Sequence, residues 1–244
     1  MRSPSGSDKA LPLSHDLPAK SPSVLLRAIL LGEVLLFIGA ALAYLWWYLP
    51  SEEATRGGSA MFCILLGAWP IALNLIHGDG LREAGLRADN LASSARQAGL
   101  VVLVAGLGVL GVGVVAKGLH WFGWGQLAAK AGKYAVWGLM QQYLLQSFAL
   151  RRLRQARLPA AWACASAAGL FAFLHAPNWM LVGLTAAMGM VWCALFLRRA
   201  NLLPLGLAHA LLAMLIYYAW PDSWHAGLTI GPMYLQQAAG GLGP

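Results

Sequence analysis

The feature that most constrains this chain is a succession of seven apolar runs, with most Lys and Arg residues in the connections between them. A helix that crosses a bilayer needs about 20 apolar residues. Backbone groups in lipid must also be hydrogen-bonded within their own segment, which favours helices. The sequence therefore predicts an all-α fold, a polytopic transmembrane helical bundle. The predicted spans are Val24 to Leu49, Ser59 to Ile76, Gly99 to Val115, Tyr134 to Leu153, Ala160 to His175, Trp179 to Leu197 and Leu202 to Tyr218, with a weak eighth candidate at Thr229 to Ala239.

Composition supports a membrane protein and argues against nucleic acid as a partner. Of the 244 residues, 59% are hydrophobic and 11% are charged, which leaves too little polar surface for a soluble globule. The formal charge of +8 is not gathered in a stripe with interleaved aromatic residues. We therefore expect the basic residues to meet membrane lipids.

The distribution of Lys and Arg predicts the orientation. Alternate connections hold 13 of these 17 residues and the other connections hold 4. Because cytoplasmic loops are enriched in Lys and Arg, the N-terminus is predicted to be cytoplasmic in an inner or plasma membrane. Residues 1–22 are predicted to be a disordered cytoplasmic tail, since they hold few apolar residues. Residues 23–244 form the predicted transmembrane domain, in which residues 117–132 are read as an interfacial loop or short helix.

Polar side chains within the apolar runs are few and indicate where a site would lie. Gln141, Gln142 and Gln146 lie in the fourth run, and His175 and His209 lie in the fifth and seventh. A buried amide without hydrogen-bond partners is costly, so these groups should face the bundle interior. The residues alone leave two alternatives open: a structural polar cluster, or a site for water or substrate.

A metal or other cofactor is not expected. A catalytic zinc ion usually needs three protein ligands, and only two suitable imidazoles are evident. The cysteines, Cys63, Cys164 and Cys193, are isolated within apolar runs and do not show thiolate metal spacing.

Three motifs, in their order, resemble the CPBP intramembrane protease family, also called the CAAX prenyl protease type II or Abi family. That family has E-E-x-x-x-R on one helix, F-x-x-x-H on the next and H-x-x-x-N or H-x-x-x-D near the end. The corresponding segments here are Q-Q-Y-L-L-Q from Gln141, F-A-F-L-H from Phe171 followed by A-P-N, and H-A-L-L-A from His209. The resemblance covers residues 23 to about 235, with the motif-bearing core at 133–218. It implies an endopeptidase that hydrolyses membrane-associated or prenylated peptides within the bilayer.

The resemblance also implies roles for individual residues. The catalytic positions fall on Gln141, Gln142, His175 and His209. The positions around the substrate fall on Gln146, Phe171, Asn178 and Ala213.

The departures from the family pattern fall on the chemistry. A carboxamide keeps the shape of a carboxylate but accepts no proton near neutral pH, so Gln141 cannot be a general base. Gln146 replaces the family's arginine, which is physically consistent, because an arginine without its two carboxylates would be a buried unpaired cation. The resemblance therefore leaves two functions: an endopeptidase of weak or lost activity, or a catalytically silent pseudoprotease acting as a peptide, lipid-tail or immunity-type scaffold. A transporter is disfavoured by the absence of internal repeats.

Glu33 is the carboxylate that lies inside the first run, about 9 Å past Arg27 by helical rise. If it reaches His175 or His209, it is a surrogate base. Otherwise it is a structural partner.

Overall fold

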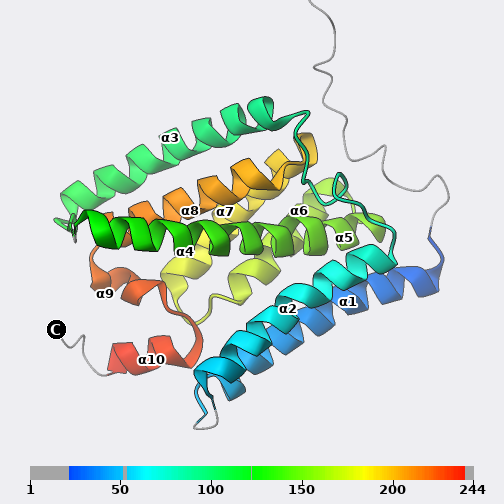
Figure 1. The fold of residues 1–244 in the computed structure, drawn as a ribbon, viewed down its shortest axis with the longest axis horizontal. Coiled ribbons are helices and arrows are strands. Elements are labelled where there is room, and N and C mark those ends of the chain that lie inside the picture. Colours follow the sequence, from blue (N-terminus) through cyan, green and yellow to red (C-terminus); the bar gives the residue numbers. More distant parts are fainter. Residues whose placement is uncertain (1–21, 52–53, 122, 240–244) are drawn as a thin grey trace, which may run out of the picture.

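A computed structural model of the chain describes residues 22–51, 54–121 and 123–239, and the described part is all-helical (Figure 1). The predicted tail lies almost wholly outside the described residues. The elements are α1 (Val24–Ala43), η2 (Tyr44–Tyr48), α2 (Arg56–Ile76), α3 (Leu91–Val115), α4 (Trp124–Gln142), η3 (Tyr143–Leu150), α5 (Arg151–Gln155), α6 (Ala160–Phe173), α7 (Trp179–Arg198), α8 (Leu202–Ala219), α9 (Asp222–His225), η4 (Ala226–Leu228) and α10 (Gly231–Ala239).

Five of the described helices are long and apolar enough to cross a membrane: α1 with η2, α2, α3, α7 and α8. The fifth predicted span is the shorter apolar helix α6. The predicted total of seven spans is therefore not confirmed by length and composition. The eighth candidate corresponds to α10, whose nine residues rise only about 13 Å, too short to cross a bilayer.

The central helix differs most from its predicted form. It runs without a break from Trp124 through α4, the π-helical segment η3 and α5 to Gln155, so it begins ten residues before the expected Tyr134. Residues 124–132, expected in an interfacial loop or short helix, are its first turns. Polar residues such as Lys130 and Lys133 lower the hydropathy of these turns, so the start of the helix is not marked by an apolar run.

Small residues let the central helix lie close to α8, which runs alongside it in Figure 1. A Cβ atom added at Gly138 would lie 2.6 Å from the carbonyl oxygen of Gly206, and one added at Gly206 would lie 2.8 Å from Cα of Leu139. Glycines at such crossings permit close backbone approach in membrane bundles. This contact fixes the position of α4 relative to α8, and both helices carry site residues.

The interruption between the fifth and sixth predicted spans, at Ala176-Pro177-Asn178, is confirmed. Helix α6 ends at Phe173 and α7 begins at Trp179, with Asn178 capping α7 by accepting a hydrogen bond from the backbone N–H of Leu181. The break places His175 in a turn at the end of α6, where a straight helix would carry the chain past the core.

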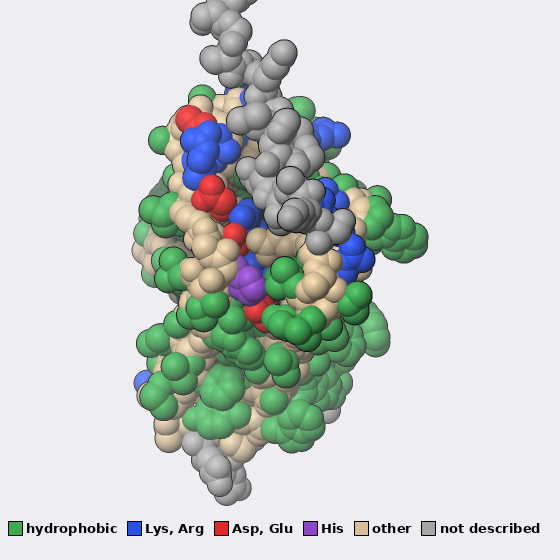
Figure 2. Space-filling model, turned by 90° about the vertical axis from the view of Figure 1, so that its right-hand side faces the viewer, with side chains coloured by type: hydrophobic (Ala, Val, Ile, Leu, Met, Phe, Trp, Pro, Cys, Tyr) green, Lys and Arg blue, Asp and Glu red, His purple; other side chains and the backbone are tan. Residues whose placement is uncertain are grey.

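The basic connections gather at one end of the bundle, where α2, α5 and α7 end. The loop before α3 contacts the loop before α8 there, since Asn201 donates to the carbonyl of Arg87. Figure 2 views this end: the Lys, Arg, Asp and Glu side chains gather in its upper part, above a largely hydrophobic surface. α9 and α10 lie at the opposite end (Figure 1).

Candidate functional site

A hydrogen-bonded chain of amides and an imidazole crosses the middle of the bundle. Gln146 Nε2 donates to Gln142 Oε1 over 3.1 Å, and Gln142 Nε2 donates to His209 Nδ1 over 2.9 Å. Both glutamines are fully buried. We call Gln142, Gln146 and His209 the amide–imidazole cluster. Because Nδ1 of His209 accepts, the ring proton of this histidine is on Nε2.

His175 is held beside this cluster by its own helix. Its Nδ1 donates to the backbone carbonyl of Phe171 over 2.7 Å, and the Phe171 ring packs edge-on against the rings of His175 and His209 at 4.8 and 6.2 Å between centroids. Nδ1 therefore carries the proton, and Nε2 of His175 keeps its lone pair.

Five of the predicted site residues line one chamber of about 790 Å³: Gln141, Phe171, His175, His209 and Ala213. The outer walls come from the first half of α4, the second half of α8 and the segment from Gly227 to Gln237, so the chamber lies at the end of the bundle opposite the basic connections. Its volume falls in the range typical of small-molecule sites.

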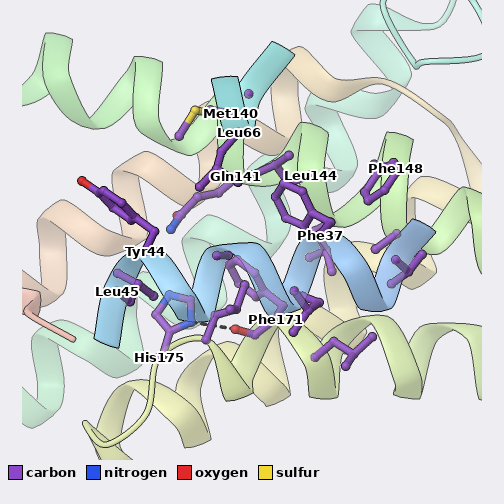
Figure 3. A pocket seen from close by; sticks show the side chains of 18 of the residues that line it. Phe37, Tyr44, Leu45, Leu66, Met140, Gln141, Leu144, Phe148, Phe171 and His175 are labelled. Carbon is purple, nitrogen blue, oxygen red and sulfur yellow. Dashed lines mark hydrogen bonds between the residues drawn. The ribbon is translucent and has the colours of Figure 1, made fainter. Parts of the chain in front are cut away.

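A second, apolar cavity of about 140 Å³ adjoins the chamber, and we call it the slot. Gln141, Phe171 and His175 line both cavities. Figure 3 shows how the remaining wall of the slot is built, with side chains such as Phe37, Leu144 and Phe148 around its interior. The two cavities therefore meet at an amide and an imidazole.

The chamber offers hydrogen bonds but no carboxylate. None of the described residues that line it is Asp or Glu. The amide of Gln141 and the imidazole of His175 can orient a peptide or a water molecule, but an amide cannot take a proton from water at neutral pH. The site can bind polar groups, and its only proton acceptors among the described lining residues are histidines.

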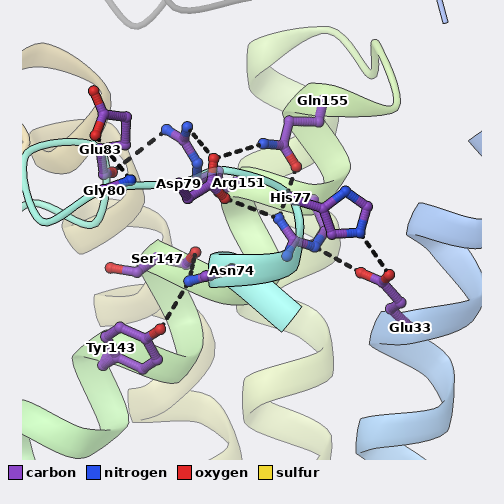
Figure 4. A network of polar contacts seen from close by, with 11 residues as sticks. Glu33, Asn74, His77, Asp79, Gly80, Glu83, Tyr143, Ser147, Arg151 and Gln155 are labelled. Atoms are coloured by element: carbon purple, nitrogen blue, oxygen red, sulfur yellow. Dashed lines mark hydrogen bonds and ion pairs between the residues drawn. The ribbon is translucent and has the colours of Figure 1, made fainter. Parts of the chain in front are cut away.

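Glu33 lies elsewhere, in a charged network at the basic end (Figure 4). Its carboxylate receives hydrogen bonds from His77 Nε2 at 2.8 Å and Arg152 Nε at 2.7 Å. Arg152 is fully buried and also donates to Asp79 at 3.1 Å, and Arg151 donates to Asp79 at 2.6 Å. We call Glu33, His77, Asp79, Arg151 and Arg152 the charged network. The condition for a surrogate base is not met, because Glu33 is bound to these groups rather than to His175 or His209.

The network also shifts the titration of Asp79, which follows α2. Burial by itself would raise the pKa of this carboxyl, but the hydrogen bonds and positive charges of Arg151 and Arg152 outweigh it and hold the pKa below the ordinary value. Asp79 is therefore ionised at neutral pH and ties the end of α2 to α5.

Two predicted substrate positions do not line either cavity. The side chain of Asn178 is fully buried, and its Nδ2 donates to the carbonyls of His225 and Thr229 while its Oδ1 caps α7. Gln146 lies behind Gln142, which itself does not line the chamber. These residues hold neighbouring groups in place by hydrogen bonds and do not face either cavity.

Sequence reasoning missed two sets of residues. Asp79 and Arg152 were not predicted to form a buried ion pair. Nothing in the sequence distinguishes Arg152 from the other arginines around it. Lys130 and Lys133 line the chamber, and here a signal existed: with Tyr134, Trp137, Gly138 and Gln141 they recur at helical spacing, which marks one face of a single helix.

These observations define a class: a helical membrane protein with a buried, neutral amide–imidazole site beside an internal chamber. Residues 123–215 match the family model described as type II CAAX prenyl endopeptidase Rce1-like. The match runs from the start of α4 into α8, covers less than half of the chain and contains all three motifs, so this core is similar to that family. No curated protein and no solved structure matches the chain significantly.

Proposed function

We propose that this protein binds a membrane-associated or prenylated peptide, or its lipid tail, in the chamber and acts as a catalytically silent scaffold. The single observation that carries the proposal is the composition of the chamber: Gln141, His175 and His209 line it together with no described carboxylate. The chamber has polar groups that can hold a peptide, and its described lining has no carboxylate to accept a proton from water.

The physical argument concerns the attack of water on a peptide carbonyl. A positioned general base typically supplies about 10²- to 10⁴-fold in rate. Gln141 cannot supply it, and Glu33 is engaged with His77 and Arg152. Hydrolysis should therefore be weak or absent while binding persists.

A second candidate, residual endopeptidase activity, is favoured by one observation. Because His175 donates from Nδ1 to the carbonyl of Phe171, its Nε2 lone pair is available at the junction of the chamber and the slot. A neutral imidazole is a suitable general base near pH 7. In this alternative, His175 activates water and the Gln141 amide orients the substrate.

The proposal includes a location. The bias of 13 against 4 Lys and Arg between alternate connections supports an N-terminus in the cytoplasm and an inner or plasma membrane. The chamber would then open toward the non-cytoplasmic side. No cofactor or metal is assigned to the reaction or to binding, and this remains a prediction.

The experiment compares binding with turnover. The full chain is purified in detergent and incubated with prenylated and unprenylated peptides, beside the variant Gln141→Glu/Gln142→Glu/Gln146→Arg/Ala213→Asn and the variants His175→Ala and His209→Ala. We expect the native chain to bind peptide without cleavage and the fourfold variant to gain cleavage. Cleavage by the native chain that is lost in His175→Ala would instead establish the residual endopeptidase.

A further inference from the structure

One face of α4 forms a wall of the chamber that is cationic at one end and neutral at the other. Its lining residues are Lys130, Lys133, Tyr134, Trp137, Gly138 and Gln141. Spacings of three and four residues place them on one face of the helix. Helical rise puts Lys130 about 16 Å from Gln141 along the axis. A ligand lying along this wall would meet positive charge first and amide and imidazole groups last.

The two lysines are not neutralised by described residues. Neither Lys130 nor Lys133 forms an ion pair with a described carboxylate, and no described Asp or Glu lines the chamber. The ammonium group of Lys130 lies 3.9 Å from the centroid of the Tyr217 ring, a cation–π contact that orients it. The chamber therefore carries net positive charge at its outer end.

Membrane orientation does not explain these lysines. Only four of the 17 Lys and Arg residues lie in connections on this side, and they are Arg56, Lys117, Lys130 and Lys133. Positive charge on this side opposes the bias that orients the helices. Lys130 is half-buried and Lys133 is exposed, and both line the open outer part of the chamber rather than a lipid-facing surface alone.

The rest of the chamber wall suits an apolar chain. Leu184, Met188, Leu212 and Ile216 line it from α7 and α8. At its inner end the chamber meets the apolar slot through Gln141, Phe171 and His175. The slot, about 140 Å³ in volume, has an almost wholly apolar lining and extends the apolar surface beyond the chamber.

We propose that Lys130 and Lys133 form a head-group site for a single-chain anionic lipid. A carboxylate or phosphate lies between the two ammonium groups, and the chain runs along α4 toward Gln141 and the slot. Charge-assisted hydrogen bonds to such a group are stronger than neutral ones. The inference goes beyond the proposed function and stands whether or not the chamber binds peptides.

The test uses the full chain in discs of phosphatidylcholine. Radiolabelled oleate and oleoyl-glycerol-phosphate serve as the carboxylate and phosphate probes, and monooleoylglycerol serves as the neutral probe. The variants are Lys130→Gln/Lys133→Gln, the charge-keeping Lys130→Arg/Lys133→Arg, and Lys117→Gln, a matched control that removes a lysine near the same end but outside the chamber. The peptide panel above is measured on the same preparations.

We expect the double Gln variant to bind an anionic probe about tenfold or more weakly, the loss typical of a charge-assisted contact, with neutral-probe binding unchanged. The double Arg variant and Lys117→Gln should bind as the native chain does. Which probe binds more tightly distinguishes a carboxylate from a phosphate ligand.

Equal binding of anionic probes by the native chain and the double Gln variant would overturn the site. So would lysine-dependent binding of a peptide carboxyl terminus with no binding of either anionic lipid. Lysine-dependent lipid binding without any peptide binding would overturn the proposed function and leave this inference standing.

Discussion

The central helix carries two polar groupings inside the bundle, one built from charged side chains and one from neutral side chains. At its end, the charged network brings Arg151 and Arg152 against Glu33 and Asp79. Six and ten residues before Arg152, Gln146 and Gln142 belong to the amide–imidazole cluster, which contains no formal charge. Each grouping has fully buried members, so the difference is not one of exposure.

The comparison teaches that buried charge is kept here only where partners surround it. Arg152 lies among two carboxylates and Gln155, which together receive its hydrogen bonds. At the site, Gln142, Gln146 and His209 are neutral groups joined by two hydrogen bonds. A mixed state, with one charge among neutral amides, would carry the cost of an unpaired buried ion.

The largest effect is expected from breaking the charged network. Arg152→Ala leaves Glu33 and Asp79 without their shared buried cation, and removing one partner of a buried ion pair typically costs about 3–5 kcal/mol. The free energy of unfolding should fall by that amount in reversible unfolding with sodium dodecyl sulfate. The exposed Arg198 provides the control, since Arg198→Ala should change little. Equal losses in the two variants would show that the network does not stabilise the fold.

Much of the fold was predictable because lipid imposes a simple rule. Each apolar run coincides with a helix, and Pro177 and Asn178 mark the break where they were expected. The start of α4 was not predictable from hydropathy, because its first turns include Lys130 and Lys133, which line the chamber. A polar residue in a membrane protein reports a non-lipid environment, and the sequence does not say whether that environment is solvent or a cavity.

Some of the predicted site residues line one chamber, and the places of the others did not follow from the sequence. Spacing and motif order brought Gln141, His175 and His209 to one chamber. Gln142 bonds His209 instead of lining the chamber, and this depends on the rotation of the helix about its axis. Asn178 is held by the carbonyl of His225, a residue far away in the sequence. The two alternatives for Glu33 stayed open for the same reason: its depth could be estimated from the sequence, and its direction could not.

The next effect is a smaller loss from placing one charge in the neutral cluster. Gln142→Glu puts a carboxyl group beside His209 and Gln146, where the carboxylate is desolvated and the donor to His209 is lost. We expect a loss on the order of 1–3 kcal/mol, the usual cost of an unsatisfied buried polar group. Adding Gln146→Arg should recover part of it, because the new cation pairs with the new carboxylate. A double-mutant cycle measured by the same unfolding method gives this coupling. If the single variant is as stable as the native chain, the cluster does not require neutrality.

The smallest effect concerns Asp79 and depends on pH. Its pKa is lower in the folded chain than the ordinary value of 3.8, so the folded state favours the ionised form. The resulting stability is present above pH 4 and is lost as the pH falls through the lowered pKa. Asp79→Asn should cost on the order of 1 kcal/mol at pH 7, since the amide still accepts a hydrogen bond from Arg151. Thermal unfolding midpoints of the two proteins should converge as the solution is acidified below pH 4. A difference that stays constant over that range would mean that Asp79 contributes through packing, and the contrast between charged and neutral groupings would then rest on Glu33 and Arg152 alone.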